Sequence, residues 1–80
     1  MIERANSLEY GLTSYVFTRS QRLAHDTADA LEAGMVAVNT FALASAETPY
    51  GGIKQSGFGR EGGSQGIHDY LNVKYVNMVM

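Results

Sequence analysis

The sequence contains no cysteine and a single proline, Pro49, among its 80 residues. Without cysteine the chain can form neither a disulfide bond nor a thiolate metal site, and it carries no thiol nucleophile. No apolar run approaches the roughly 20 residues that a membrane-spanning helix needs, and the N-terminus lacks the apolar region of a signal peptide. We therefore expect a cytoplasmic protein with no membrane partner.

Charge is also scarce, because Asp, Glu, Lys and Arg make up 18% of the residues and the net charge is −2. The basic residues are scattered and form no patch that would bind nucleic acid. The two histidines, His25 and His68, lie far apart and lack further ligands at metal-binding spacing, so we expect no metal site. A chain of this length makes at most one small domain, and its low charge indicates that other protein covers much of its surface.

A β-α-β unit is predicted for the first half of the chain. Residues 14–18 are rich in β-branched and aromatic side chains and read as a strand. An amphipathic helix follows, capped by Thr18 or Ser20 and running to about Ala33. The apolar run 35–38 is a second strand, and continuous apolar strands on either side of a helix indicate parallel pairing. The fold class is therefore α/β.

Shorter elements flank this unit. Residues 2–8 look like the end of a helix, and Gly34 stands where a left-handed residue would end the main helix. A short helix is expected over residues 64–70. Residues 72–80 carry apolar side chains on both faces, so we expect a terminal strand that pairs with a partner subunit.

The most unusual segment is rich in glycine, since seven of the nine glycines lie between Gly51 and Gly66. Residues 57–62 match the G-x-G-x-x-G pattern of dinucleotide-binding loops. That loop requires a preceding hydrophobic strand and an acidic residue about 20 positions later, and neither is present. We therefore predict no cofactor site here. By composition alone, Glu61 is a solvated or capping residue, and Lys54 is either an anion contact or a solvated cation.

Three sequence blocks, in this order and at this spacing, form a recognisable pattern. They are Gly11-Leu12-Thr13-Ser14-Tyr15-Val16-Phe17-Thr18, Gly34-Met35-Val36-Ala37-Val38-Asn39 and Pro49-Tyr50-Gly51-Gly52-Ile53-Lys54-Gln55-Ser56-Gly57-Phe58-Gly59-Arg60-Glu61, continued by Tyr70 and Lys74. Together they resemble the C-terminal segment of the aldehyde dehydrogenase superfamily over nearly the whole chain.

The resemblance implies that residues 1–71 belong to the α/β catalytic domain of a larger enzyme and that residues 72–80 form its oligomerisation strand. The parent enzyme would oxidise an aldehyde with NAD or NADP as cofactor. In this family the nucleophilic cysteine, the general base and the dinucleotide pocket lie upstream of the matched region. The chain alone is thus expected to be non-catalytic and to bind no cofactor, with the N-terminal part of the same enzyme and further copies of it as partners.

The same resemblance implies roles for particular residues. Phe41 and Ser45 belong to the loop over the substrate entrance, and Tyr50 corresponds to an aromatic residue that lines the substrate tunnel. Glu61 resembles a buried acid that relays protons near the reacting water, where burial would raise its pKa.

Other residues shape the loop. Asn39 resembles an asparagine that ends a core strand and ties down the following loop, while Pro49, Gly51 and Gly52 give the loop its path.

Residues 67–71 and 73–75 are most similar to succinate-semialdehyde dehydrogenases, so succinate semialdehyde or a similar semialdehyde is the expected substrate. Those enzymes hold the distal carboxylate partly with a serine, but this chain has Ala44 at that position and Ser45 one residue later. Asn72 also replaces an acid that many relatives carry. Two alternatives from other classes are a stand-alone oligomerisation module without enzymatic activity and a small nucleotide-binding domain.

Overall fold

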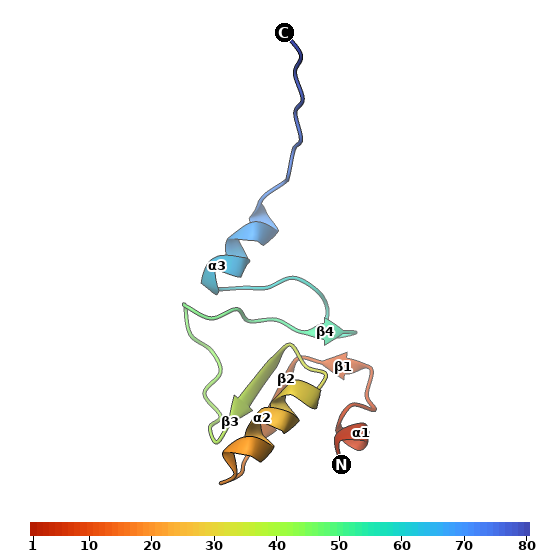
Figure 1. Ribbon diagram of the computed structural model, residues 1–80, viewed down its shortest axis with the longest axis vertical. Coiled ribbons are helices and arrows are strands. Elements are labelled where there is room, and N and C mark those ends of the chain that lie inside the picture. The colour runs from red at the N-terminus through yellow and green to blue at the C-terminus, as the bar shows by residue number, and fades with distance from the viewer.

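The computed structural model describes residues 1–80 as a small α/β unit with a long C-terminal extension (Figure 1). The elements, in chain order, are α1 (Ile2–Ala5), β1 (Tyr10–Gly11), β2 (Thr13–Val16), α2 (Gln21–Ala30), β3 (Met35–Val38), β4 (Ile53–Lys54), α3 (Gly63–Gly66) and the 3₁₀ helix η1 (Ile67–Tyr70). The predicted helices and the two predicted strands of the β-α-β unit are all present, although some of their ends differ by a few residues.

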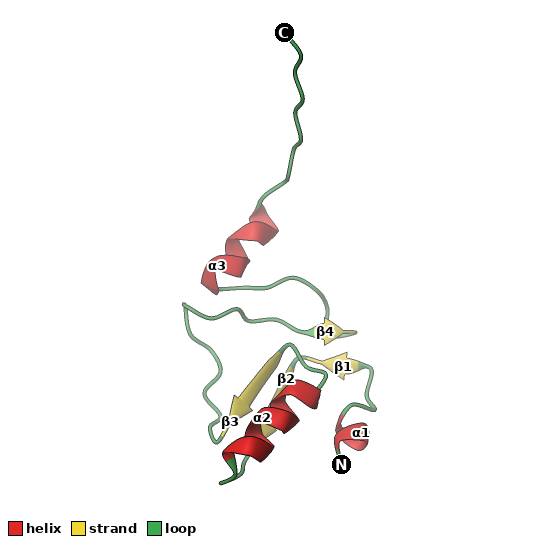
Figure 2. Cartoon of the chain, in the orientation of Figure 1, coloured by secondary structure: helices red, strands yellow, loops and turns green.

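The predicted β-α-β unit is confirmed. β2 and β3 pair in parallel, with Thr13 opposite Met35 and Val16 opposite Val38. Parallel strands cannot be joined by a tight turn, and α2 makes the crossover between them. Figure 2 shows α2 lying along one face of the two strands, and Thr27 is the helix residue buried there.

The ends of α2 are set by side-chain hydrogen bonds. Ser20, one of the two predicted caps, accepts a hydrogen bond from the backbone N–H of Leu23 at 3.2 Å. The helix ends at Ala30, before the predicted Ala33, because the Asn6 side chain hydrogen-bonds backbone groups at its C-terminal end. The Asn6 amide donates to the Ala30 carbonyl and accepts from the Glu32 N–H, both at 2.8 Å. These bonds satisfy backbone groups that a further helical turn would otherwise use.

The prediction of a left-handed Gly34 is wrong, because this residue is not among the glycines with positive φ. The side chain is excluded for lack of space instead. A Cβ at Gly34 would overlap the carbonyl oxygen of Gly51 and lie 2.8 Å from the Gly52 Cα. The start of β3 and the Gly-rich segment therefore touch backbone to backbone.

A second two-stranded sheet joins the Gly-rich segment to the N-terminal part of the chain. β1 and β4 pair antiparallel, with Tyr10 opposite Lys54. The Lys54 ammonium group donates to the carbonyls of Asn6 and Leu8 at 3.1 and 3.3 Å and to the Glu32 carboxylate at 3.0 Å. Lys54 is thus a structural cation, neither an anion contact for a ligand nor a freely solvated charge.

The chain buries very little of itself. Only six residues are buried, among them Met35 and Ala37 on β3. The radius of gyration is 16.7 Å, whereas a compact domain of this length has about 12 Å. No helix has both the length and the apolar character to cross a membrane.

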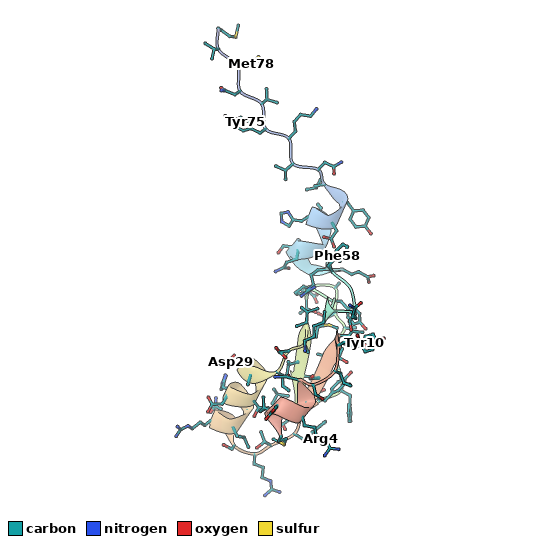
Figure 3. The ribbon with its side chains drawn as sticks, turned by 90° about the vertical axis from the view of Figure 1, so that its right-hand side faces the viewer. Arg4, Tyr10, Asp29, Phe58, Tyr75 and Met78 are labelled. Carbon is teal, nitrogen blue, oxygen red and sulfur yellow. The ribbon has the colours of Figure 1, made fainter.

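The extension, residues 72–80, accounts for the elongated shape. It runs away from the body, and Tyr75 and Met78 project into solvent along it (Figure 3). It has no strand partner within the chain. Its assignment as an oligomerisation strand therefore stays a prediction.

Substituting Gly34 by alanine tests the backbone contact. We expect Gly34→Ala to lower the free energy of unfolding by about 3 kcal/mol, because the new methyl group overlaps backbone that cannot move aside. Gly57→Ala is the comparison: Gly57 has φ +106° but no atom within 4 Å of an added Cβ, so only about 1–2 kcal/mol of backbone strain is added. Urea unfolding followed by circular dichroism measures both. A smaller loss for Gly34→Ala than for Gly57→Ala would contradict the close approach.

Candidate functional site

An open hollow of about 570 Å³ gathers three of the predicted site residues, Ser45, Tyr50 and Glu61. The complete lining is Ala44, Ser45, Ala46, Thr48, Tyr50, Glu61 and Gly62. The hollow therefore lies between the loop that follows β3 and the Gly-rich segment. Its polar groups are hydroxyls and one carboxylate, without a lysine, an arginine or a histidine.

Tyr50 and Glu61 face each other across an antiparallel bridge that forms one wall of the hollow. The Tyr50 N–H donates to the Glu61 carbonyl at 2.6 Å, and the Glu61 N–H donates back to the Tyr50 carbonyl at 2.7 Å. Residues paired in this way carry their side chains side by side. Both side chains are exposed, so this chain alone does not supply the burial that the resemblance implied for Glu61.

The opposite wall is the turn from Ser45 to Thr48. The two hydroxyls lie 3.0 Å apart, and the Thr48 hydroxyl also donates to the Ser45 carbonyl at 3.3 Å. The Gly63 N–H donates to the Ala46 carbonyl at 3.0 Å, which ties this turn to the segment that follows Glu61. A backbone hydrogen bond therefore links the two walls.

Phe41 lies outside this hollow. Its ring packs against Tyr15 and Phe17, with centroid distances of 5.4 and 5.1 Å and tilts of 54° and 53°. Tilted aromatic pairs at such distances are stabilising. The structure thus assigns Phe41 to an aromatic cluster beside β2, and its predicted contact with substrate has no support from the hollow.

Asn39 ends β3, as predicted, but it ties down a different loop from the one expected. Its side-chain oxygen accepts a hydrogen bond from the Thr18 N–H at 2.9 Å, and its own N–H donates to the Val16 carbonyl at 2.7 Å. These bonds hold the connection between β2 and α2 rather than the segment after β3. Asn39 has φ +59°, a left-handed conformation that asparagine tolerates better than most residues.

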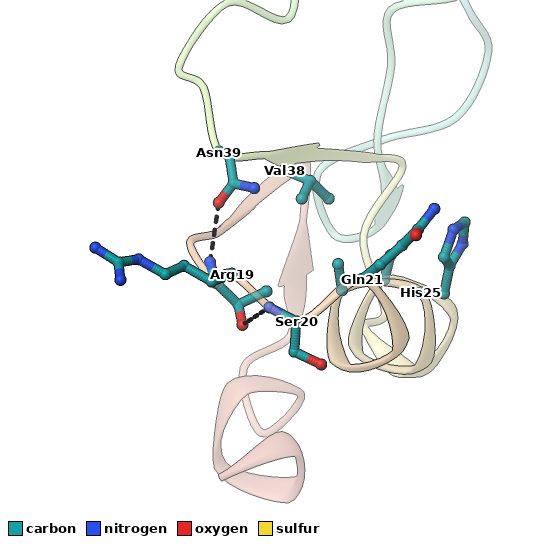
Figure 4. Close-up of a pocket in the computed structure, with 9 residues that line it drawn as sticks. Arg19, Ser20, Gln21, His25, Val38 and Asn39 are labelled. Carbon is teal, nitrogen blue, oxygen red and sulfur yellow. Dashed lines mark hydrogen bonds between the residues drawn. The ribbon is translucent and has the colours of Figure 1, made fainter.

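A second hollow, of about 330 Å³, lies beside this asparagine (Figure 4). Its lining includes the start of α2 and His25, and Figure 4 shows the Arg19 side chain directed away from it. The hydrogen bonds drawn there are structural, since they connect Asn39 to the Thr18 N–H and the Thr18 hydroxyl to the Ser20 N–H.

Gly51 lets the Gly-rich segment fold around Arg60, whereas Gly52 leaves room for the Ser56 side chain. A Cβ on Gly51 would lie 2.7 Å from the Arg60 Cδ. The Arg60 guanidinium donates to the carbonyls of Gly52 and Gly59 at 2.9 and 2.7 Å, and the Asp69 carboxylate accepts from the Arg60 N–H at 2.6 Å. Pro49, partly buried, leads into this segment.

The G-x-G-x-x-G pattern has no phosphate-binding context. The preceding strand, β4, has two residues, and the helix that follows, α3, has four. The Asp69 carboxylate occupies the loop's interior, 2.9 Å from where a Cβ on Gly59 would lie. A negative side chain at that place repels a pyrophosphate. The residues present do not fit a dinucleotide.

Sequence reasoning missed the structural roles of three residues, Asn6, Lys54 and Asp69. Each of them bonds a backbone group at least nine residues away in the sequence, and no local sequence motif predicts such a contact. Lys54 also has an unusual backbone conformation for a strand residue, with φ +56°.

Comparison with known proteins identifies the family. The model of the aldehyde dehydrogenase family matches residues 1–76. The chain belongs to the aldehyde dehydrogenase family. The predicted family and its α/β fold are thereby confirmed.

Individual aldehyde dehydrogenases agree with this assignment. The chain is 50% identical over 76 residues to 3-sulfolactaldehyde dehydrogenase of Pseudomonas putida, covering 95% of this chain and 16% of that protein. A crystal structure of succinate-semialdehyde dehydrogenase from Burkholderia pseudomallei superposes with a TM-score of 0.89 at 44% identity, covering 94% of this chain and 16% of that one. An NAD⁺ complex of aldehyde dehydrogenase from Bacillus cereus superposes with a TM-score of 0.87 at 46% identity, and the match covers 91% of this chain and 15% of that one. The chain thus spans about 16% of the length of the curated relative.

Substitutions at Asn39 separate its two roles. Asn39→Gly removes the acceptor for the Thr18 N–H but tolerates a left-handed φ, and we expect a loss of about 1 kcal/mol in the free energy of unfolding. Asn39→Ala removes the acceptor and adds strain, for a loss of about 2–3 kcal/mol. Asn39→Asp keeps an acceptor oxygen and is the control. Equal losses for the glycine and alanine variants in urea unfolding would show that the conformation is not constrained.

Proposed function

We propose that residues 1–80 are the C-terminal part of an NAD(P)-dependent aldehyde dehydrogenase that oxidises a semialdehyde, such as succinate semialdehyde, to the carboxylic acid. The observation that carries this proposal is the family match over residues 1–76 together with the gathering of Ser45, Tyr50 and Glu61 around one hollow. In this proposal the remainder of the enzyme supplies the nucleophile, because this chain contains no cysteine.

The cofactor site is proposed to lie outside this chain as well. Three backbone N–H groups of the Gly-rich segment already have partners, since that of Arg60 bonds the Asp69 carboxylate and those of Gly57 and Glu61 bond backbone carbonyls. No reaction step is therefore assigned to a dinucleotide held by these residues.

The residues of the hollow can bind substrate and move a proton. The Tyr50 ring offers an apolar surface for the carbon chain of an aldehyde. The Ser45 hydroxyl can bond an oxygen at the far end of that chain. The Glu61 carboxylate can accept a proton from a water molecule in the hollow and release it to solvent, which is the role of a relay in hydrolysis.

A semialdehyde is supported by the relatives and by the polar hydroxyls of the hollow. One superposed relative is named for succinate semialdehyde. The Ser45 and Thr48 hydroxyls, which bond each other, lie in the lining and can offer a hydrogen bond to a distal oxygen, which a purely alkyl chain lacks.

The extension favours a second candidate, a stand-alone oligomerisation module. Val73, Tyr75 and Met80 are almost fully exposed, and an unpartnered apolar segment of this kind tends to associate with another chain. In either case residues 72–80 are proposed to make the contact between copies. Size measurement of the 80-residue chain separates them: a well-folded monomer counts against the stand-alone module.

The isolated chain is expected to be inactive, whereas a chimaera is expected to be active. Purified 80-residue protein mixed with succinate semialdehyde and NAD⁺ or NADP⁺ should produce no reduced cofactor at 340 nm. Residues 1–76, placed in the 3-sulfolactaldehyde dehydrogenase of Pseudomonas putida in exchange for its matching segment, should give a working enzyme; the same enzyme without that segment is the control. Aldehyde oxidation by the isolated chain would contradict the proposal.

Glu61→Gln in that active chimaera should lower kcat about tenfold or more, because the amide cannot accept a proton from water. Glu47→Gln is the matched control, since Glu47 is also an exposed loop glutamate but lies before β4 and outside the hollow. Both variants conserve side-chain size, so steady-state kinetics isolates the carboxylate. Equal kcat values for the two variants would remove Glu61 from the proposed relay.

A further inference from the structure

The Ser45–Thr48 pair carries an inference that rests on the proposed function and sharpens it. The two hydroxyl oxygens are 3.0 Å apart in the lining of the hollow. We propose that Thr48 is a positioning residue whose hydroxyl orients that of Ser45 toward an oxygen at the distal end of the aldehyde's carbon chain. The pair would thereby distinguish aldehydes with an oxygen-bearing end from those with a plain alkyl chain.

The hydrogen-bond capacity of the pair supports this. A hydroxyl has one proton to donate and two lone pairs to accept. Without ligand, the Thr48 proton can go to the Ser45 carbonyl at 3.3 Å. When Thr48 rotates its proton toward the Ser45 oxygen, the Ser45 proton becomes free to bond an oxygen of the ligand. Thr48 can thus switch Ser45 from donating within the pair to donating outward.

The backbone around the pair is fixed. The Thr48 N–H donates to the Ser45 carbonyl at 3.4 Å, and the Gly63 N–H holds Ala46 from the other side at 3.0 Å. Thr48 is also β-branched and precedes Pro49, and both properties restrict its rotamer or backbone. The Thr48 hydroxyl therefore needs little further ordering to hold Ser45.

The charge of the hollow limits what the pair can recognise. Glu61 supplies its only carboxylate, and no cation lines it. The pair therefore contributes hydrogen bonds and not charge neutralisation. The expected selectivity is between succinate semialdehyde, which has distal oxygens, and butanal, which has the same number of carbon atoms and none.

The test uses the complete enzyme that carries residues 1–80. Thr48→Val, which is isosteric and lacks the hydroxyl, should raise KM for succinate semialdehyde roughly five- to tenfold, as expected for one lost hydrogen bond, with kcat unchanged. KM for butanal should stay within about twofold. Thr48→Ser should restore the wild-type value for both aldehydes.

Two further variants separate positioning from structure. Thr40→Val removes a hydroxyl from the same loop outside the hollow, where it accepts a bond only from the Ala42 N–H, and should change neither KM. Because Thr48 acts through Ser45, the double variant Ser45→Ala/Thr48→Val should have the KM of Ser45→Ala alone.

The outcomes are distinguishable. An active enzyme in which Thr48→Val changes both aldehydes equally, or changes neither, overturns the positioning role and leaves the proposed function in place. A wild-type enzyme that oxidises no aldehyde overturns the proposed function and this inference with it.

Discussion

The backbone contact between Gly34 and Gly51 is the constraint on which the rest of this structure depends. It presses the Gly-rich segment against the start of β3, where the space left for a side chain is nil. With the segment held there, β4 can pair with β1, and Tyr50 can reach Glu61. The Tyr50–Glu61 bridge in turn forms one wall of the hollow.

Hydrogen bonds, more than burial, give the loops their positions. With only six buried residues, apolar packing cannot specify the path of the long segment between β3 and α3. Side chains that bond backbone groups do so instead: Lys54 binds two carbonyls near α1, Arg60 binds two more within its own segment, and Asn39 holds the start of α2. Bonds of this kind carry direction, which a small apolar contact does not. The extension beyond η1 makes no such bond and leaves the body.

Local patterns predicted the part of the fold that local forces build. The strand–helix–strand order and the Ser20 cap follow from periodicity and capping chemistry, and β3 was placed at residues 35–38. The error at Gly34 has a physical cause, since glycine serves two needs and the sequence does not say whether conformation or space applies. The family resemblance singles out Ser45, Tyr50 and Glu61 one by one, and only the structure brings them to one hollow. The packing of Phe41 against Tyr15 and Phe17 could not be predicted, because these partners are far away in the sequence and contacts at that distance have no local pattern.

Asn6 requires the two opposite ends of one amide. Its nitrogen must give a proton to the Ala30 carbonyl, and its oxygen must take one from the Glu32 N–H. Aspartate has the same shape but offers only acceptors, so one of its oxygens would meet the Ala30 carbonyl oxygen. Leucine offers neither kind of group, and glutamine is a methylene too long. A residue in a partly exposed segment, where substitution is ordinarily tolerated, is thus restricted to a single amino acid by the polarity of two backbone atoms.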